Sequence, residues 1–473
     1  MKKLPENWIE TKLENVLEKI VGGGTPSKTS SSFFKGKIPF MTVKDMKKRF
    51  PSDTIDHISE EAIIASATTL VPADTLIVAT RMSLGKIVRP TVSTAINQDL
   101  KALFPLCGID KTYLEYFWLS KANHIKELGT GTTVKGIRLN DIRNLQISLA
   151  PLSEQKRISK KINILISNVD NCRVRLKNIS IILKRFRQSV IVAATSGSLT
   201  ADWRKENIAS SISAGEVVRE AKDELFDYLL QRSSKEKKVP SHPDLTYWAS
   251  HTVPPTWVVC SVNQFAECLD RLRVPIKREN RSSNEGLFPY YGANGEVSRI
   301  DDFIFDDELV LVTEDETFYG REKPIAYRSS GKCWVNNHAH VLRPRTKDAA
   351  DYLCYALMHY DVIPWLSGTT GRAKLTQAAL NALPISMPPE LELVEIVRRV
   401  KTLFAFADRL EARLATACSA VDRLTPALLA KAFRGELVPQ DPADEPASEL
   451  LARLAASRAA EVAKPRRART AKA

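Results

Sequence analysis

Residues 158–190 read ISKKINILISNVDNCRVRLKNISIILKRFRQSV. Apolar positions recur through this stretch at alternating spacings of four and three residues, which is a heptad pattern sustained over more than four heptads. These positions are Ile158, Ile162, Leu165, Val169, Cys172, Leu176, Ile179, Leu183, Phe186 and Val190. The pattern predicts one long helix with a single apolar stripe.

The same stripe occurs a second time, 238 residues further along the chain (Ile158 to Ile396). Each position of the second stripe is again apolar: Ile396, Val400, Leu403, Ala407, Leu410, Leu414, Ala417, Val421, Leu424 and Leu428. The offset also carries Gly197 onto Gly435 beyond the helices. Because no insertion is needed across this stretch, we infer an internal repeat.

Two heptad helices in one chain favour pairing as an antiparallel coiled coil. A helix of about 40 residues is roughly 60 Å long. Pro426 interrupts the second stripe near its end, and we expect a kink there. The alternative is that the helices are only part of a core or an oligomerisation stalk.

A segment of different sequence precedes each helix. LPENW, ending at Trp8, resembles VPPTW, ending at Trp257. Both segments also end in Gly-Thr-Thr, within GTGTTVKGIRLNDI (129–142) and SGTTGRAKLTQAAL (367–380). Short β-rich runs between turn signals predict strand-rich domains. The expected fold class is α+β: two mixed α/β heads separated by two long antiparallel helices, with an internal pseudo-twofold repeat.

The repeat predicts six regions in the 473 residues. The first head covers 1–150 and the first long helix 151–200, followed by a short helix and linker over 201–252. The second head covers 253–388 and the second long helix 389–438. A short helix and a basic tail, which we expect to be disordered, occupy 439–473.

The net charge of the chain is +14 and its pI is about 9.3. Clustered Lys and Arg residues gain affinity for polyanions by releasing counterions, so the charge favours a nucleic-acid partner. The run RLRVPIKRENR (271–281) and the closing KPRRARTAK concentrate this charge. Neither a long apolar run nor a signal-like N-terminus is present, so we expect a cytoplasmic protein without membrane association. The seven cysteines are scattered, and we expect reduced, mostly buried thiols.

Catalytic motifs are missing from the sequence. IVGGGTPSKTSSSFFKGK (20–37) comes close to a phosphate loop, but Ser27 stands in place of the second glycine. Pro26 offers no N–H to an anion, and no helical pattern follows. The only close histidine pair is His338 and His340, which we interpret as two residues on one face of a strand. The sequence therefore predicts neither a metal site nor catalytic residues.

Several stretches together resemble the specificity subunit of type I restriction–modification systems. PLSEQKRISKKI (151–162) and LTPALLAKAFRGEL (424–437) look like parts of its two constant regions. GGGTPS, GKIPFMTVKD, INQDLKAL and GTTVKGI are similar to pieces of its first target-recognition domain, and PYYGANG, DDFIFD and NNHAHVLRP to pieces of its second. The resemblance extends to about Glu461, with one departure: Leu393 follows Glu392 where the family has Gln.

The resemblance implies a non-catalytic subunit that reads a bipartite target in double-stranded DNA. It also implies two methyltransferase subunits and, in the full complex, two restriction subunits as partners. S-adenosylmethionine, ATP and Mg²⁺ would then bind to the partners, and this chain would hold no cofactor. The alternatives are a self-contained DNA-modifying enzyme and a coiled-coil scaffold without sequence-specific DNA binding.

Base edges are read by Arg, Lys, Asn and Gln side chains, whereas Lys, Arg, Ser and Thr also hold phosphates. In the first head we therefore expect DNA contacts from the loop 22–29 and from three later segments. The predicted residues are Gly23, Gly24, Thr25, Ser27, Lys28, Arg81, Asn97, Gln98 and Lys135. The glycines would let the backbone approach DNA closely. In the second head the predicted residues are Tyr290, Tyr291, Asn294, Arg321, Asn336, Asn337, Arg372 and Lys374.

Overall fold

The computed structural model describes residues 4–131, 134–207, 214–236, 241–248, 253–276, 286–315, 318–368 and 373–463. Arg372, the end of the basic run 271–281 and the closing tail lie outside these residues. The chain divides into two compact units. Unit 1 comprises Met1–Lys177 and Ala415–Ala473, and unit 2 comprises Asn178–Leu414. Each unit therefore contains one head and parts of both long helices.

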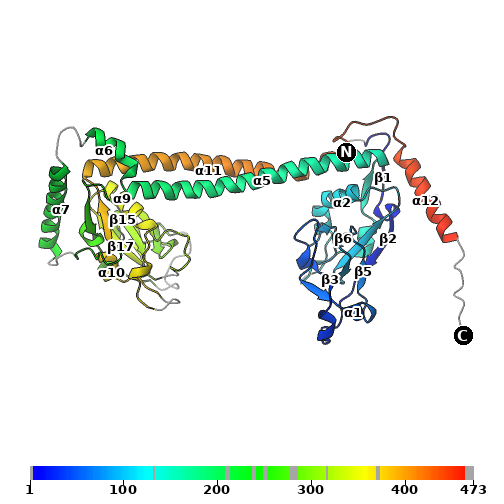
Figure 1. Ribbon diagram of the computed structural model, residues 1–473, viewed down its shortest axis with the longest axis horizontal. Helices are drawn as coiled ribbons and strands as arrows, with labels where there is room; N and C mark the ends of the chain where they lie inside the picture. Colours follow the sequence, from blue (N-terminus) through cyan, green and yellow to red (C-terminus); the bar gives the residue numbers. More distant parts are fainter. Residues whose placement is uncertain are drawn as a thin grey trace. The chain divides into compact units, whose positions relative to one another are not determined.

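The two predicted helices are α5 (Leu152–Thr195) and α11 (Glu390–Ala432), and they lie side by side within each unit (Figure 1). In unit 1, Arg173 of α5 pairs with Asp422 of α11 at 3.3 Å. In unit 2, Arg187 of α5 forms an ion pair with Glu411 of α11 at 3.1 Å. Ile158, Ile162 and Val400 of the stripes are buried. Helix α11 continues past Pro426 to Ala432, and the kink expected there stays a prediction.

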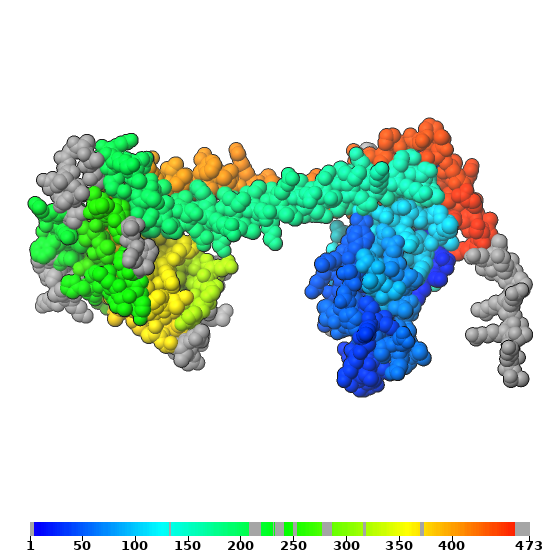
Figure 2. Space-filling model, in the orientation of Figure 1, coloured from blue at the N-terminus to red at the C-terminus, as the bar shows by residue number. Residues whose placement is uncertain are grey.

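The first head contains two four-stranded sheets. One has the order β2 (Leu17–Gly22), β9 (Leu100–Pro105), β6 (Leu76–Ala79) and β7 (Ile87–Val88). The other has the order β4 (Asp56–Ile58), β3 (Ile38–Met41), β8 (Thr94–Ile96) and β5 (Thr69–Val71). The aromatic side of α2 (Lys111–Ser120) is buried in the core, and α3 (Ala122–Glu127) follows it. Within unit 1, α1 (Glu60–Ile64) lies at the end of the head away from α5 (Figures 1 and 2).

The second head is built on a single six-stranded sheet. Its order is β12 (Ala266–Cys268), β17 (Ala339–Pro344), β15 (Phe305–Thr313), β16 (Ala326–Val335), β13 (Phe288–Gly292) and β14 (Gly295–Ile300). Helix α9 (Lys347–Met358) packs on strands β15 and β16, with Leu353 and Leu357 fully buried. The two heads thus differ in sheet organisation, as their unlike sequences predict.

The repeat is retained where each head joins its helix. Strand β1 (Ile9–Lys12) pairs antiparallel with β10 (Gln146–Leu149), and β11 (Val258–Ser261) pairs in the same way with β18 (Pro384–Met387). Trp8 Nε1 donates to Glu154 at 2.8 Å, and Trp257 Nε1 donates to Glu392 at 2.9 Å. The glutamates at the starts of α5 and α11 therefore hold equivalent tryptophans.

The leucine at position 393 cannot make the side-chain hydrogen bonds that Gln155 makes in the first copy. In the first copy, Gln155 accepts a hydrogen bond from the backbone N–H of Asp110 and donates one to the carbonyl of Ala150. Leu393 makes neither bond and is instead fully buried in the apolar core of unit 2. The helix start is therefore held by packing in the second copy, without loss of the tryptophan contact.

Each helix ends against the head of the other copy. Gly435 has φ +74°, and a Cβ there would lie 2.3 Å from Pro5 Cγ. Gly197 has φ +76°, and a Cβ there would lie 2.4 Å from Pro254 Cγ. Only glycine fits both the left-handed backbone and the close approach. This exchange explains why the compact units do not follow the linear order of the chain.

The tails after the helices cover the same heads. In unit 1, α12 (Ala447–Ala463) packs on the short 3₁₀ helix η1 (Leu13–Val16) and lies along the side of the head (Figure 2). In unit 2, α7 (Ala214–Glu236) packs on β11, and its Ala221 and Leu225 are buried in the core of that unit. The predicted α+β fold with two α/β heads, paired long helices and an internal repeat is confirmed. Among the described residues, each helix is too short or too polar to cross a bilayer.

Candidate nucleic-acid interfaces

The glycine-rich loop of the first head follows β2 and is anchored to the protein itself. A Cβ at Gly23 would lie 2.0 Å from the carbonyl oxygen of Ile96, and a Cβ at Gly24 would lie 2.6 Å from the backbone of Ala67. Thr68 also donates a hydrogen bond to the Gly24 carbonyl. The glycines thus allow close approach to the protein's own backbone, and the contact of Gly23 and Gly24 with DNA stays a prediction. Only the four-residue 3₁₀ helix η2 (Ser31–Phe34) follows, so this is not a phosphate loop.

Two predicted residues of the first head are in contact. Thr25 donates its hydroxyl hydrogen to Gln98 Oε1, which joins the loop after β2 to the turn before β9. Ser27, Lys28 and Gln98 are exposed beside this contact. Asn97 is only 6% exposed, and its side chain bonds to Asp99 within the turn. Asn97 therefore shapes the turn and cannot present its amide to a base.

Arg81 and Lys135 lie together at a second place on this head. Residues Arg81 and Gly136 form an isolated β-bridge, and Arg81 lies 3.9 Å from Asp99. Both basic side chains are exposed. Burial lowers the pKa of Lys101; the charge of Asp99 opposes this effect and that of Arg81 adds to it.

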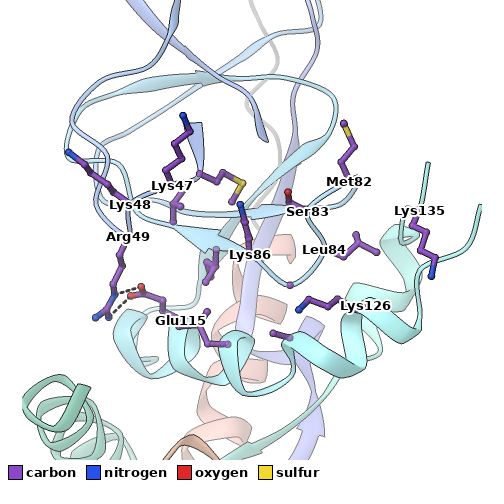
Figure 3. Close-up of a pocket in the computed structure, with 16 residues that line it drawn as sticks. Lys47, Lys48, Arg49, Met82, Ser83, Leu84, Lys86, Glu115, Lys126 and Lys135 are labelled. Carbon is purple, nitrogen blue, oxygen red and sulfur yellow. Dashed lines mark hydrogen bonds and ion pairs between the residues drawn. The ribbon is translucent and has the colours of Figure 1, made fainter. Parts of the chain in front are cut away.

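A cavity of about 700 Å³ opens beside Lys135 (Figure 3). Its floor includes Leu84, and exposed lysines surround it: Lys47, Lys48, Lys86, Lys126 and Lys135. Arg49, by contrast, donates to Glu115 and lies over the ring of Tyr116. Four of these lysines were not predicted from the sequence: Lys47, Lys48, Lys86 and Lys126. The short run KDMKKR (44–49) signalled two of them, whereas Lys86 and Lys126 reach the cavity from separate elements.

Two of the tyrosines and asparagines predicted in the second head, Tyr290 and Asn336, are internal. Tyr290 is fully buried, and its hydroxyl accepts a hydrogen bond from the backbone of Ile276. Asn336 is 6% exposed and accepts from the backbone of His338. Tyr291 is half-buried against Tyr327 at 5.9 Å, and burial raises its pKa. In this conformation neither Tyr290 nor Asn336 can reach DNA, whereas Asn337 is exposed.

Asn294 and Arg321 of the second head are brought together. Arg321 Nη2 donates to Asn294 Oδ1 at 2.8 Å and to the carbonyl of Pro324 at 3.0 Å. Lys374 forms an ion pair with Glu314 at 2.7 Å, and this hydrogen bond raises the pKa of Lys374. Arg372 lies outside the described residues.

The loops that carry Gly-Thr-Thr are anchored in the same way in both heads. Thr130 bridges Gly136 in the first, and Ser367 bridges Lys374 in the second. In the first head, the N–H of Ile137 donates to the carbonyl of Thr80, the residue after β6. In the second head, the N–H of Leu375 donates to the carbonyl of Glu314, the residue after β15. The two heads thus anchor these loops at equivalent points despite their different sheets.

Among the described residues, one group could in principle bind a metal ion: Asp270, Glu314 and His340. His340 Nε2 donates to the Leu375 carbonyl at 2.8 Å, and Nδ1 lies 2.5 Å from Asp270. Arg273 and Lys374 both pair with Glu314. Both ring nitrogens of His340 are thus held by protein partners, and both oxygens of Glu314 face cations. The group is therefore a buried ion network. His338 precedes β17 and is exposed, whereas His340 lies within β17 and is buried. The prediction that both histidines lie on one face of a strand is therefore wrong.

Two unlike heads carried on one duplicated helical frame define a protein with two recognition domains. Residues 5–180 and 254–417 both match the family model described as the type I restriction modification DNA specificity domain. The chain belongs to this family of type I restriction–modification specificity subunits. Family membership assigns it the role of DNA recognition, with catalysis in other subunits.

Individual proteins similar to this chain are also specificity subunits. The chain is 30% identical to the EcoDI specificity subunit of Escherichia coli, over 73% of this chain and 76% of that one. It is 25% identical to the EcoKI specificity subunit of Escherichia coli strain K12, over 97% of each chain. The HsdS subunit from Thermoanaerobacter tengcongensis has a similar fold, with a TM-score of 0.52 and 16% identity over 92% of this chain and 98% of that one.

Proposed function

We propose that this chain reads a bipartite DNA target, with one half-site read by each head and an unspecified gap between them. The observation that carries the proposal is the duplicated junction: Trp8–Glu154 and Trp257–Glu392 hold two different heads on equivalent helix starts. Half-sites on one face of B-DNA recur about every 34–36 Å. Paired helices of this length can set such a spacing.

The proposed contacts are the predicted residues whose side chains are not buried. In the first head these are Thr25, Ser27, Lys28, Arg81, Gln98 and Lys135, to which the cavity adds Lys47, Lys48, Lys86 and Lys126. In the second head these are Tyr291, Asn294, Arg321, Asn337 and Lys374, together with Arg372. The mixture of amides, arginines and lysines suits base edges and phosphates together.

The proposed partners are two methyltransferase subunits and, in the full complex, two restriction subunits. These would bind S-adenosylmethionine, ATP and Mg²⁺, and this chain would need no cofactor. The relatives are named as specificity subunits of type I restriction enzymes, which supports such an assembly. Because its target is genomic DNA, we place the complex in the cytoplasm. The six-region division of the chain remains part of the proposal.

Selection from a random duplex library tests this function. The chain is purified with its methyltransferase partner, and bound duplexes are sequenced. We expect a two-part motif with a fixed gap. Replacing residues 1–150 by the head of another family member should change one half of the motif only, and a change in both halves would contradict independent heads. DNA modification by the isolated chain would instead indicate an enzyme, and the absence of any motif would indicate a scaffold.

A further inference from the structure

The hairpin between β6 and β7 has an exposed methionine at its tip. Met82 has φ +64°, in the left-handed region that favours glycine, and is 69% exposed. A single exposed apolar residue is common on protein surfaces. A non-glycine residue with a positive φ is uncommon, and such backbone strain is concentrated at functional sites.

The residues around Met82 fix this conformation. Its backbone N–H donates to the Lys135 carbonyl at 3.1 Å, and the N–H of Ser83 donates to the Arg81 carbonyl at 2.7 Å. Leu84 is buried beneath the tip. Gly85 has φ +85°, and a Cβ there would lie 2.8 Å from the Ala122 carbonyl oxygen. The hairpin is therefore anchored on both sides of Met82, while the side chain of Met82 points away (Figure 3).

Cations line the same cavity as Met82 and flank it in the sequence. Arg81 has 62% of its side chain exposed, and Lys86, Lys126 and Lys135 are exposed around the adjoining cavity. Double-stranded DNA offers both complements, because phosphates attract the cations while base faces and the thymine methyl accept an apolar group.

We propose that Met82 is the apolar base-contacting residue of the first head. It contacts bases of the first half-site while the cations beside it hold the flanking phosphates. The contact rests on the proposed function and adds a specificity-determining residue to it. An apolar side chain can meet a thymine methyl in the major groove or enter between two bases.

The test replaces Met82 by glycine, with Met82→Leu as the matched control. The complex with the methyltransferase partner is used throughout, on the duplex found by selection and on a scrambled duplex. Glycine suits a positive φ, so M82G should melt no lower than wild type. Its affinity for the target should fall about tenfold or more, as for loss of a base contact. Affinity for the scrambled duplex should be unchanged, and M82L should bind the target within about threefold of wild type.

The DNA distinguishes the two kinds of contact. If Met82 meets a thymine methyl, uracil at one position should weaken binding of wild type but not of M82G. If it enters a base step, 2-aminopurine at that step should brighten with wild type and not with M82G. Equal target affinity of M82G and wild type would overturn the role of Met82. If the wild-type complex bound the selected and the scrambled duplex equally well, the proposed function would be overturned as well.

Discussion

The indole Nε1 of Trp257 donates a 2.9 Å hydrogen bond to Glu392, at the start of the second long helix. The carboxylate is fully buried and also accepts bonds from Thr200 at 2.7 Å and Arg204 at 2.6 Å. A group that follows the first helix is therefore tied to the start of the second. The equivalent Glu154 accepts from Trp8 and Gln440, and no cation of the described residues is bonded to it.

This difference predicts unequal effects of one substitution. Glu392→Gln leaves Arg204 without its carboxylate and should cost about 3 kcal/mol of unfolding free energy. Glu154→Gln can still accept from Trp8, and because burial already raises the pKa of Glu154, it should cost less than about 1 kcal/mol. Urea unfolding of both variants measures the comparison. Equal losses would show that Arg204 contributes little to the junction.

Removal of Lys135 tests the cationic surface of the first head. If Lys135 contacts phosphate, Lys135→Ala should weaken binding to all sequences and lower the slope of log affinity against log salt by about one. Lys205→Ala, an exposed lysine of α6 (Ala201–Asn207) in unit 2, is the control and should leave the slope unchanged. Binding isotherms at several salt concentrations give the slope. An unaltered slope for Lys135→Ala would reject the phosphate contact.

The repeat could be predicted from the sequence because it lies in side-chain periodicity and constant offsets. The offset also placed Glu392 correctly, although Leu393 departs from the family pattern. The recognition surface was less accessible to such reasoning. Tyr290 is buried where the backbone of Ile276 crosses it, and a single sequence does not reveal such a tertiary contact. Lys86 and Lys126 meet only through tertiary folding, and the positive φ of Met82 has no signal at a non-glycine residue.

The buried ion network predicts how the second unit responds to acid. Burial favours a higher pKa for Asp270, but the hydrogen bond and charge of His340 and the charge of Arg273 lower it below 3.8. A lowered folded-state pKa gives stability that is present above about pH 4 and is lost as pH falls through the folded value.

Asp270→Asn should therefore destabilise unit 2 by about 3 kcal/mol at pH 7 and flatten its pH dependence below pH 4. Thermal unfolding between pH 2 and 7 measures both effects. Asp301→Asn, at an exposed position of the same head, should reproduce the wild-type profile. An equally steep acid loss in Asp270→Asn would contradict the assignment.

Helix length should set the gap between the half-sites. Seven residues inserted after Lys177 of α5, with seven inserted within residues 410–424 of α11, add about 10 Å and keep nearly the same faces paired. The selected motif should then have a gap longer by about three base pairs. An insertion in α5 alone should disturb the pairing and reduce assembly. An unchanged gap with full activity would refute the spacing role.

The most direct test of the central claim is a genome-wide map of adenine methylation in cells that express this chain with its methyltransferase partner. We predict a two-part motif with a fixed unspecified gap, which disappears when the gene for this chain is deleted. Methylation with no such motif, or a motif that survives the deletion while the partner is active, would contradict the assignment of sequence reading to this chain.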